Sequence, residues 1–284
     1  MDDLDAMTGL GDGAPRGMVL NILSLNGDAE IVETDGEYKT KGGFYRLLKI
    51  KGAPKGEKPE EERLGDKVNV VFLKIRRVLQ QRSSDGELVK WTNEHSTPDN
   101  VVELHTKNVQ GVEVGAARAL REKYGELRTI QYVYGLLFRD MTSEPELVKI
   151  KFRGSALGSE AKDKDVMSFY DYIYADRKDA EGNKEHLRHF ITELGAVKEV
   201  GKKTYFTVTF TQGAKLDETL CTLADQTLRE VHEKVKSLDE AVARRIASSK
   251  QGAETVAAPV ADDIQTIDYP DATGEGIDPK DIPF

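Results

Sequence analysis

Residues 67–82, KVNVVFLKIRRVLQQR, decide the expected fold of this chain. Apolar and polar residues alternate along much of this stretch, and an alternation of period two is typical of a β-strand. The pattern therefore predicts a strand over residues 67–81. The alternation also predicts two different faces: Val71, Leu73 and Ile75 on the first, and Phe72, Lys74 and Arg76 on the second.

Other segments with strand character surround this one. A strand that starts at Met18 is expected to end at the turn pair Asn26-Gly27, from which residues 29–33 return. Residues 52–59 are rich in Gly, Pro and Lys, which favours an irregular loop. Further strands are expected at residues 44–51, 101–107, 127–138 and 147–153. A hairpin is predicted from residues 190–200 and 203–211, joined at Gly201, although residues 184–194 are equally compatible with a helix.

Three helices are expected. Short ones are predicted over residues 114–124 and 165–174. The longest is predicted over residues 216–246, because its apolar residues recur at steps of three and four and form one stripe. A break at Ser237 or Asp239 would divide it into two shorter helices. Many strands with a long closing helix favour a mainly β fold with α elements (α+β), namely an OB-type barrel decorated with extra strands.

The net charge of −9 is distributed unevenly. Residues 251–284 carry eight acidic side chains and one lysine, and residues 1–15 carry four aspartates. The body, residues 16–250, therefore has a net charge of +2. We expect a folded domain over residues 16–250, a flexible acidic arm before it and a disordered acidic tail after it.

Composition also bears on compartment and chemistry. No stretch approaches the roughly 18 apolar residues of a membrane span, and Cys221 is the single cysteine. These features predict a soluble, cytoplasmic protein with no membrane partner, no disulfide and no cofactor or metal requirement.

Catalytic motifs are weak. His186 and His189 lack a matching set of metal ligands, and residues 154–158 lack the ending of a phosphate-binding loop. We therefore expect a protein that is not an enzyme.

Residues 277–284, IDPKDIPF, form the most specific feature of the sequence. The acidic tail that ends in Asp281, Ile282, Pro283 and Phe284 resembles the C-terminal tip of bacterial single-stranded DNA-binding proteins. The resemblance implies that Phe284 and its carboxylate anchor replication and repair enzymes, while Ile282 and Pro283 pack beside it and Asp281 meets basic residues. Lys280 interrupts the acidic run of that family, which predicts weaker affinity for shared partners.

Cations and aromatic residues also interleave on the expected strands. Residues 147–153 place Val148, Ile150 and Phe152 inward and Lys149, Lys151 and Arg153 outward. Such a face can stack bases and contact phosphates. The candidate DNA-binding residues are Phe72, Lys74, Arg76, Lys149, Lys151, Arg153, Tyr45, Lys49, Trp91, Tyr132, Tyr134, Lys203 and Tyr205.

These features together predict a function. We expect a single-stranded DNA-binding protein of a bacterial cell or phage-infected host, which coats DNA in replication, recombination or repair and recruits enzymes through its tip. A homo-oligomer is compatible with this interpretation. The alternative is a replication or recombination accessory protein, or a nuclease, that uses the same tail to dock on host machinery without coating DNA.

Overall fold

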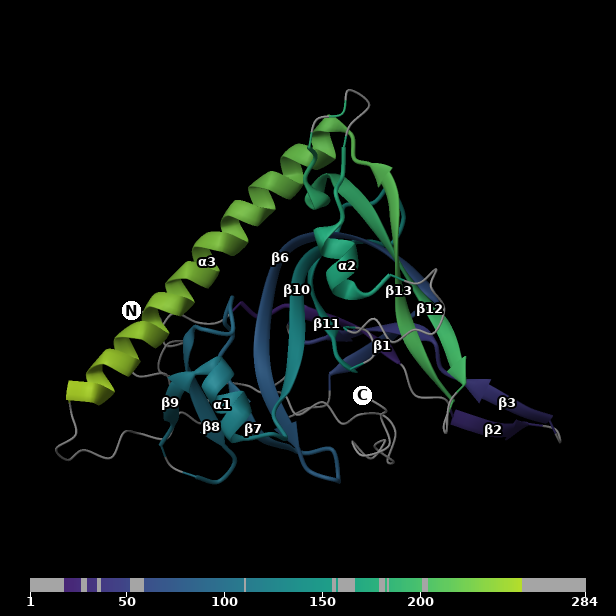
Figure 1. Ribbon diagram of the computed structural model, residues 1–284. Coiled ribbons are helices and arrows are strands. Elements are labelled where there is room, and N and C mark those ends of the chain that lie inside the picture. Colours follow the sequence, from purple (N-terminus) through teal and green to yellow (C-terminus); the bar gives the residue numbers. More distant parts are fainter. Residues whose placement is uncertain are drawn as a thin grey trace, which may run out of the picture. The chain divides into compact units, whose positions relative to one another are not determined.

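The computed structural model shows a chain in which strands predominate and the longest helix comes last (Figure 1). This confirms a mainly β fold with α elements. No helix among the described residues is long and apolar enough to cross a membrane. The structure describes residues 18–26, 30–34, 37–51, 59–109, 111–154, 157, 167–178, 182, 184–200 and 204–251. The predicted acidic arm, Lys203 and the partner-docking tip lie outside these residues.

The strands are β1 (Asn21–Asn26), β2 (Glu30–Thr34), β3 (Glu37–Lys41), β4 (Phe44–Lys49), β5 (Glu60–Gly65), β6 (Lys67–Arg82), β7 (Leu88–Thr92), β8 (Val101–Thr106), β9 (Glu113–Ala116), β10 (Arg128–Phe138), β11 (Glu146–Phe152), β12 (Phe190–Val200) and β13 (Thr204–Lys215). The helices are α1 (Ala117–Lys123), α2 (Phe169–Tyr174), the 3₁₀-helix η3 (Leu187–His189) and α3 (Glu218–Gln251).

The chain forms two compact units, which are described separately. Among the described residues, the large unit takes those within 19–76 and 130–232, and the small unit takes residue 18 and those within 77–129 and 233–251. Strands β6 and β10 and helix α3 contribute residues to both units.

The large unit is built on a mixed sheet with the strand order β5-β4-β1-β11-β10-β6. β1 runs parallel to β11, whereas β4 is antiparallel to β1, β5 to β4, and β10 to β11. β12 pairs with the start of β6 and with β13, and β2 and β3 form a separate hairpin. These described pairings leave the sheet open, so the OB-type barrel is not confirmed.

An aromatic cluster forms the core on one face of this sheet. The Phe152 ring lies 5.1 Å from the Phe169 ring, 5.5 Å from the Phe210 ring and 5.9 Å from the Phe72 ring, measured between centroids. Phe169 belongs to α2 and Phe210 to β13, so the cluster joins α2 and the β12–β13 hairpin to β6 and β11. The Tyr172 hydroxyl lies 2.8 Å from Thr192 Oγ1 inside this core.

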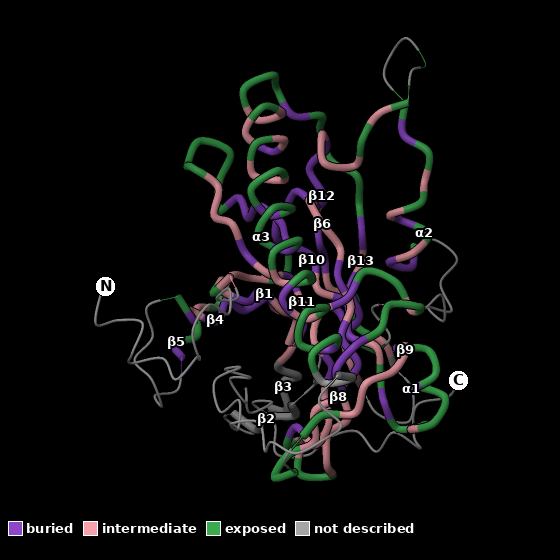
Figure 2. Tube along the Cα trace, turned by 90° about the vertical axis from the view of Figure 1, so that its left-hand side faces the viewer, coloured by how far each residue is buried: buried purple, intermediate pink, exposed green. Residues whose placement is uncertain are grey.

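The opposite face of the sheet is covered at one end by the first turns of α3. Leu220, Leu223 and Ala224 pack there against a second apolar cluster that includes Val71 and Leu136. Figure 2 shows buried segments in the central strands, whereas exposed and less exposed segments alternate along α3.

The small unit is built from the end of β6, β7, β8, β9, α1 and the last turns of α3. Its core contains Leu79, Val102, Leu104, Leu120 and Leu127. β7, β8 and β9 continue antiparallel to the end of β6.

A bidentate ion pair joins α3 to β8 within the small unit. The Arg245 guanidinium donates to both carboxylate oxygens of Glu103, at 3.2 and 2.8 Å. The Glu103 side chain is only 5% exposed, whereas that of Arg245 is 48% exposed. The Arg245 guanidinium therefore supplies much of the positive charge and hydrogen bonding that the buried Glu103 carboxylate needs.

Most predicted elements are confirmed, but β2 pairs with β3 and not with β1, so residues 29–33 do not form the predicted hairpin with β1. The hairpin forms at residues 190–200, where the alternative was a helix, and α3 is continuous past Ser237 and Asp239. The helix predicted from residue 114 starts only at Ala117, because residues 113–116 form the edge strand β9. The sequence patterns did not indicate β3, β5 or β7, which are short.

We expect Arg245→Ala to lower the free energy of unfolding by about 1–3 kcal/mol, because it leaves a buried carboxylate without its main hydrogen-bond donor. Arg244→Ala is the matched control, since Arg244 is an exposed neighbour on the same helix. Denaturant unfolding followed by circular dichroism measures both. Equal stability of the two variants would contradict a structural role for the ion pair.

Candidate nucleic-acid interface

One face of the large unit's sheet carries cations and tyrosines. Val148, Ile150 and Phe152 of β11 enter the aromatic core, so Lys149 and Lys151 lie on the opposite face, as the sequence pattern predicted.

The same relation holds on β10, where Val133 and Leu137 enter the core and Tyr132 and Tyr134 lie opposite. We call the sheet face that carries Lys149, Lys151, Tyr132 and Tyr134 the basic face.

Strand register brings these four residues together. Tyr132 pairs with Lys151, and Tyr134 pairs with Lys149, across β10 and β11. The Lys149 ammonium lies 5.3 Å from the Tyr132 ring centroid and 5.1 Å from the Tyr134 ring centroid. Both distances are within the range of cation–π attraction, which orients the lysine along the tyrosine ladder.

The same sheet face is apolar beneath the first turns of α3. Leu136 pairs with Leu147, and both pack in the apolar cluster beneath α3. Two residues further along β11 lies Lys149, and two further again lies Lys151, so the face changes from apolar to cationic within one strand. Arg153, directly after β11, is exposed.

Four predicted DNA-binding residues are buried instead, namely Phe72, Tyr45, Arg76 and Tyr134. Phe72 is 3% exposed and Tyr45 is 1% exposed, both within the aromatic cluster. The Tyr45 hydroxyl donates to the Gly195 carbonyl at 2.9 Å, and burial raises the pKa of this phenol. Arg76 is 2% exposed. Tyr134 is 1% exposed. We therefore correct the predicted stacking role of Phe72, Tyr45 and Tyr134 and the predicted phosphate contact of Arg76.

The simple alternation predicted for β6 fails at residues 73 and 74. Leu73 packs in the α3 cluster, and Lys74 Nζ also reaches α3, 2.9 Å from His232 Nδ1. Ile75 then packs against the aromatic core, on the side of Phe72. Two successive side chains thus point to one side, so Ile75 does not share a face with Leu73.

Lys49 and Tyr205, which were also predicted to bind DNA, are not part of the basic face. Lys49 follows Leu47 on the core side of β4, where its ammonium donates to Glu60 at 2.9 Å, and this hydrogen bond raises the pKa of Lys49. Tyr205 is half-buried on β13.

Trp91 lies in the small unit, where its ring stacks on His105 with centroids 5.6 Å apart. Burial lowers the pKa of His105, which favours a neutral imidazole in this stack. A DNA contact by Trp91 stays a prediction.

Two arginines that the sequence patterns did not indicate extend the basic face. Arg46 on β4 pairs with Ser24 on β1, and Arg63 on β5 pairs with Arg46. Their neighbours Leu47 and Leu64 pack against the aromatic core, which places both arginines on the opposite side. The alternation of apolar and polar residues around Arg46 could have predicted its face from the sequence. The Glu-rich segment of β5 gives no such pattern for Arg63.

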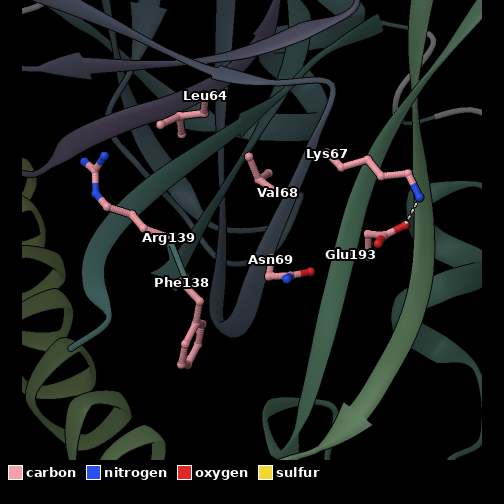
Figure 3. A pocket seen from close by; sticks show the side chains of 7 residues that line it. All are labelled: Leu64, Lys67, Val68, Asn69, Phe138, Arg139 and Glu193. Atoms are coloured by element: carbon pink, nitrogen blue, oxygen red, sulfur yellow. Dashed lines mark hydrogen bonds and ion pairs between the residues drawn. The ribbon is translucent and has the colours of Figure 1, made fainter. Parts of the chain in front are cut away.

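A shallow hollow of about 190 Å³ lies elsewhere on the large unit (Figure 3). Lys67 in its wall binds Glu193 at 2.7 Å, and Arg139 binds Glu62 and Glu146. Each cation is therefore balanced by a carboxylate, and the arginine contact lowers the pKa of Glu62. The hollow offers little to an anionic ligand.

Histidine, cysteine and carboxylate side chains of the described residues form no metal site. Within that part of the chain, no group of three or more His, Cys, Asp or Glu side chains can hold a metal ion. His186 and His189 contact each other edge to face, and burial raises the pKa of the Cys221 thiol. A raised pKa disfavours the thiolate that a nucleophilic cysteine needs.

The basic face is therefore the strongest candidate site in the described chain. Comparison with protein-family models, with curated proteins and with solved structures gives no match.

Proposed function

We propose that this protein binds and coats single-stranded DNA through the basic face and recruits partner enzymes through its C-terminal tip. The observation that carries the proposal is the paired ladder of Tyr132, Tyr134, Lys149 and Lys151 on one sheet face. Single-strand-binding surfaces combine cations that follow the phosphate backbone with aromatic rings that stack on bases. A sheet face can supply both without a closed OB-type barrel.

The arrangement favours unpaired DNA. Tyr132 is half-buried and can offer part of its ring to a base, whereas Tyr134 is 1% exposed and supports Lys149 from below. Stacking requires a base that is not paired within a duplex. The proposed activity is therefore binding without chemistry, in replication, recombination or repair in the cytoplasm.

The partner-docking function rests on Asp281, Ile282, Pro283 and Phe284. A terminal aromatic side chain combines an apolar group with a fixed negative charge, which suits a small basic and apolar pocket on another protein. The proposed partners are replication and repair proteins.

We expect the wild-type protein to bind oligo-dT more tightly than duplex DNA of equal length at moderate salt, because only the single strand offers bases for stacking. Fluorescence anisotropy with labelled oligonucleotides measures both affinities. Equal affinities would contradict the proposal, and metal-dependent cleavage of the oligonucleotide would support the accessory-nuclease alternative.

Charge and stacking variants should behave differently. Lys149→Ala and Lys151→Ala should each reduce the slope of log affinity against log salt by about 0.7, because each removes a phosphate contact. Tyr132→Ala should weaken binding by about 1–3 kcal/mol with the slope retained.

The control for both measurements is Lys198→Ala, which removes an exposed cation of β12. If the control changes affinity as much as the three variants, binding does not depend on the basic face.

Deletion of Phe284 should abolish capture of replication and repair proteins from bacterial lysate while DNA affinity stays unchanged, because the tip loses its aromatic group and its carboxylate moves to Pro283. Pull-down with full-length and shortened protein, followed by mass spectrometry, compares the captured proteins. Identical sets would show that the tip does not recruit them.

A further inference from the structure

Strand register on the basic face defines a continuous row of side chains across five strands. Tyr132 on β10 pairs with Lys151 on β11, and Lys151 pairs with Ser24 on β1. Ser24 pairs with Arg46 on β4, and Arg46 pairs with Arg63 on β5. We call these five residues the transverse row. It runs across the strands.

The transverse row has the length of a short stretch of nucleic acid. Neighbouring strands in a sheet lie about 4.8 Å apart, so the four steps from Tyr132 to Arg63 span about 19 Å. A half-buried tyrosine lies at one end and an exposed arginine at the other.

The composition of the row fits a polyanion with unpaired bases. Three of its side chains are cations, and Ser24 lies between Lys151 and the two arginines, Arg46 and Arg63. Arg63 lies 4.0 Å above the centroid of the Phe44 ring, which orients its guanidinium at the edge of the sheet.

Arg46 has a different role. Its side chain is 11% exposed and makes a long 3.4 Å contact with Glu61. It therefore contributes positive charge beneath the row more than a direct contact.

The neighbouring row is a poor alternative. It consists of Tyr134, Lys149, Ile22, Leu48 and Glu61, as the strand pairings show. Ile22 and Leu48 are each 8% exposed, and the row ends in a carboxylate. A phosphate backbone would lose hydration over the apolar centre and meet like charge at Glu61, so this row cannot guide it as far as β5.

We propose that a single DNA strand crosses the sheet along the transverse row, with a base on Tyr132, phosphates on Lys151 and Arg63, and its path perpendicular to the strands. This inference rests on the proposed function and adds Arg63 as a binding residue. It also sets a length requirement: a short oligonucleotide occupies the β10–β11 end, and only a longer one reaches Arg63.

The test compares Arg63→Ala with Lys49→Ala over oligo-dT lengths of roughly 4 to 16 nucleotides. Lys49 is the matched control because it is a cation of the adjacent strand on the opposite side of the sheet. For long oligonucleotides, Arg63→Ala should reduce the salt slope by about 0.7, and Lys49→Ala should leave it unchanged. For the shortest oligonucleotides, both variants should match the wild type. Arg63→Lys should restore the slope.

The outcomes separate this inference from the proposed function. Wild-type preference for single-stranded DNA together with an unchanged slope in Arg63→Ala would overturn the transverse path alone. Equal losses in Arg63→Ala and Lys49→Ala would also overturn it, since charge would then act without a defined path. Absence of single-strand binding by the wild-type protein would overturn both. Thermal unfolding of each variant confirms that affinity is compared between folded proteins.

Discussion

The aromatic cluster around Phe152 is the constraint on which the rest of the large unit depends. Phe152 contacts Phe72, Phe169 and Phe210, which come from β6, α2 and β13. Burying these rings in one place commits one face of the sheet to α2 and the hairpin. Every side chain of opposite parity on β10 and β11 must then point the other way, and this places Tyr132, Tyr134, Lys149 and Lys151 on a common surface.

The first turns of α3 cover an apolar part of the same sheet face. Its apolar stripe needs an apolar partner, which Leu136 and Leu147 provide. Beyond them β11 presents Lys149 and Lys151, side chains that a helix could cover only at the cost of their hydration. The change from apolar to cationic side chains on this face therefore follows from the order of residues within β11.

Sequence patterns revealed the longer strands and the faces of β11 because the period of two is a local property. They failed on β6 because the break at Leu73 and Lys74 leaves no signature in residue types, and Phe72 resembles a stacking residue as much as a core residue. Arg63 was out of reach for a different reason. Its position beside Arg46 depends on a pairing between β4 and β5 with a register shift at residues 45 and 46, which only the folded chain specifies.

The two faces of β4 and β5 also show why net charge is a poor guide to this site. Arg46 and Arg63 lie on the basic face, whereas Lys49, Glu60 and Glu62 meet on the other side. There the Lys49 ammonium is held by carboxylates, so this cation adds little field toward DNA. A body with a net charge of only +2 can nonetheless present a cationic row, because a sheet separates charges that are adjacent in the sequence.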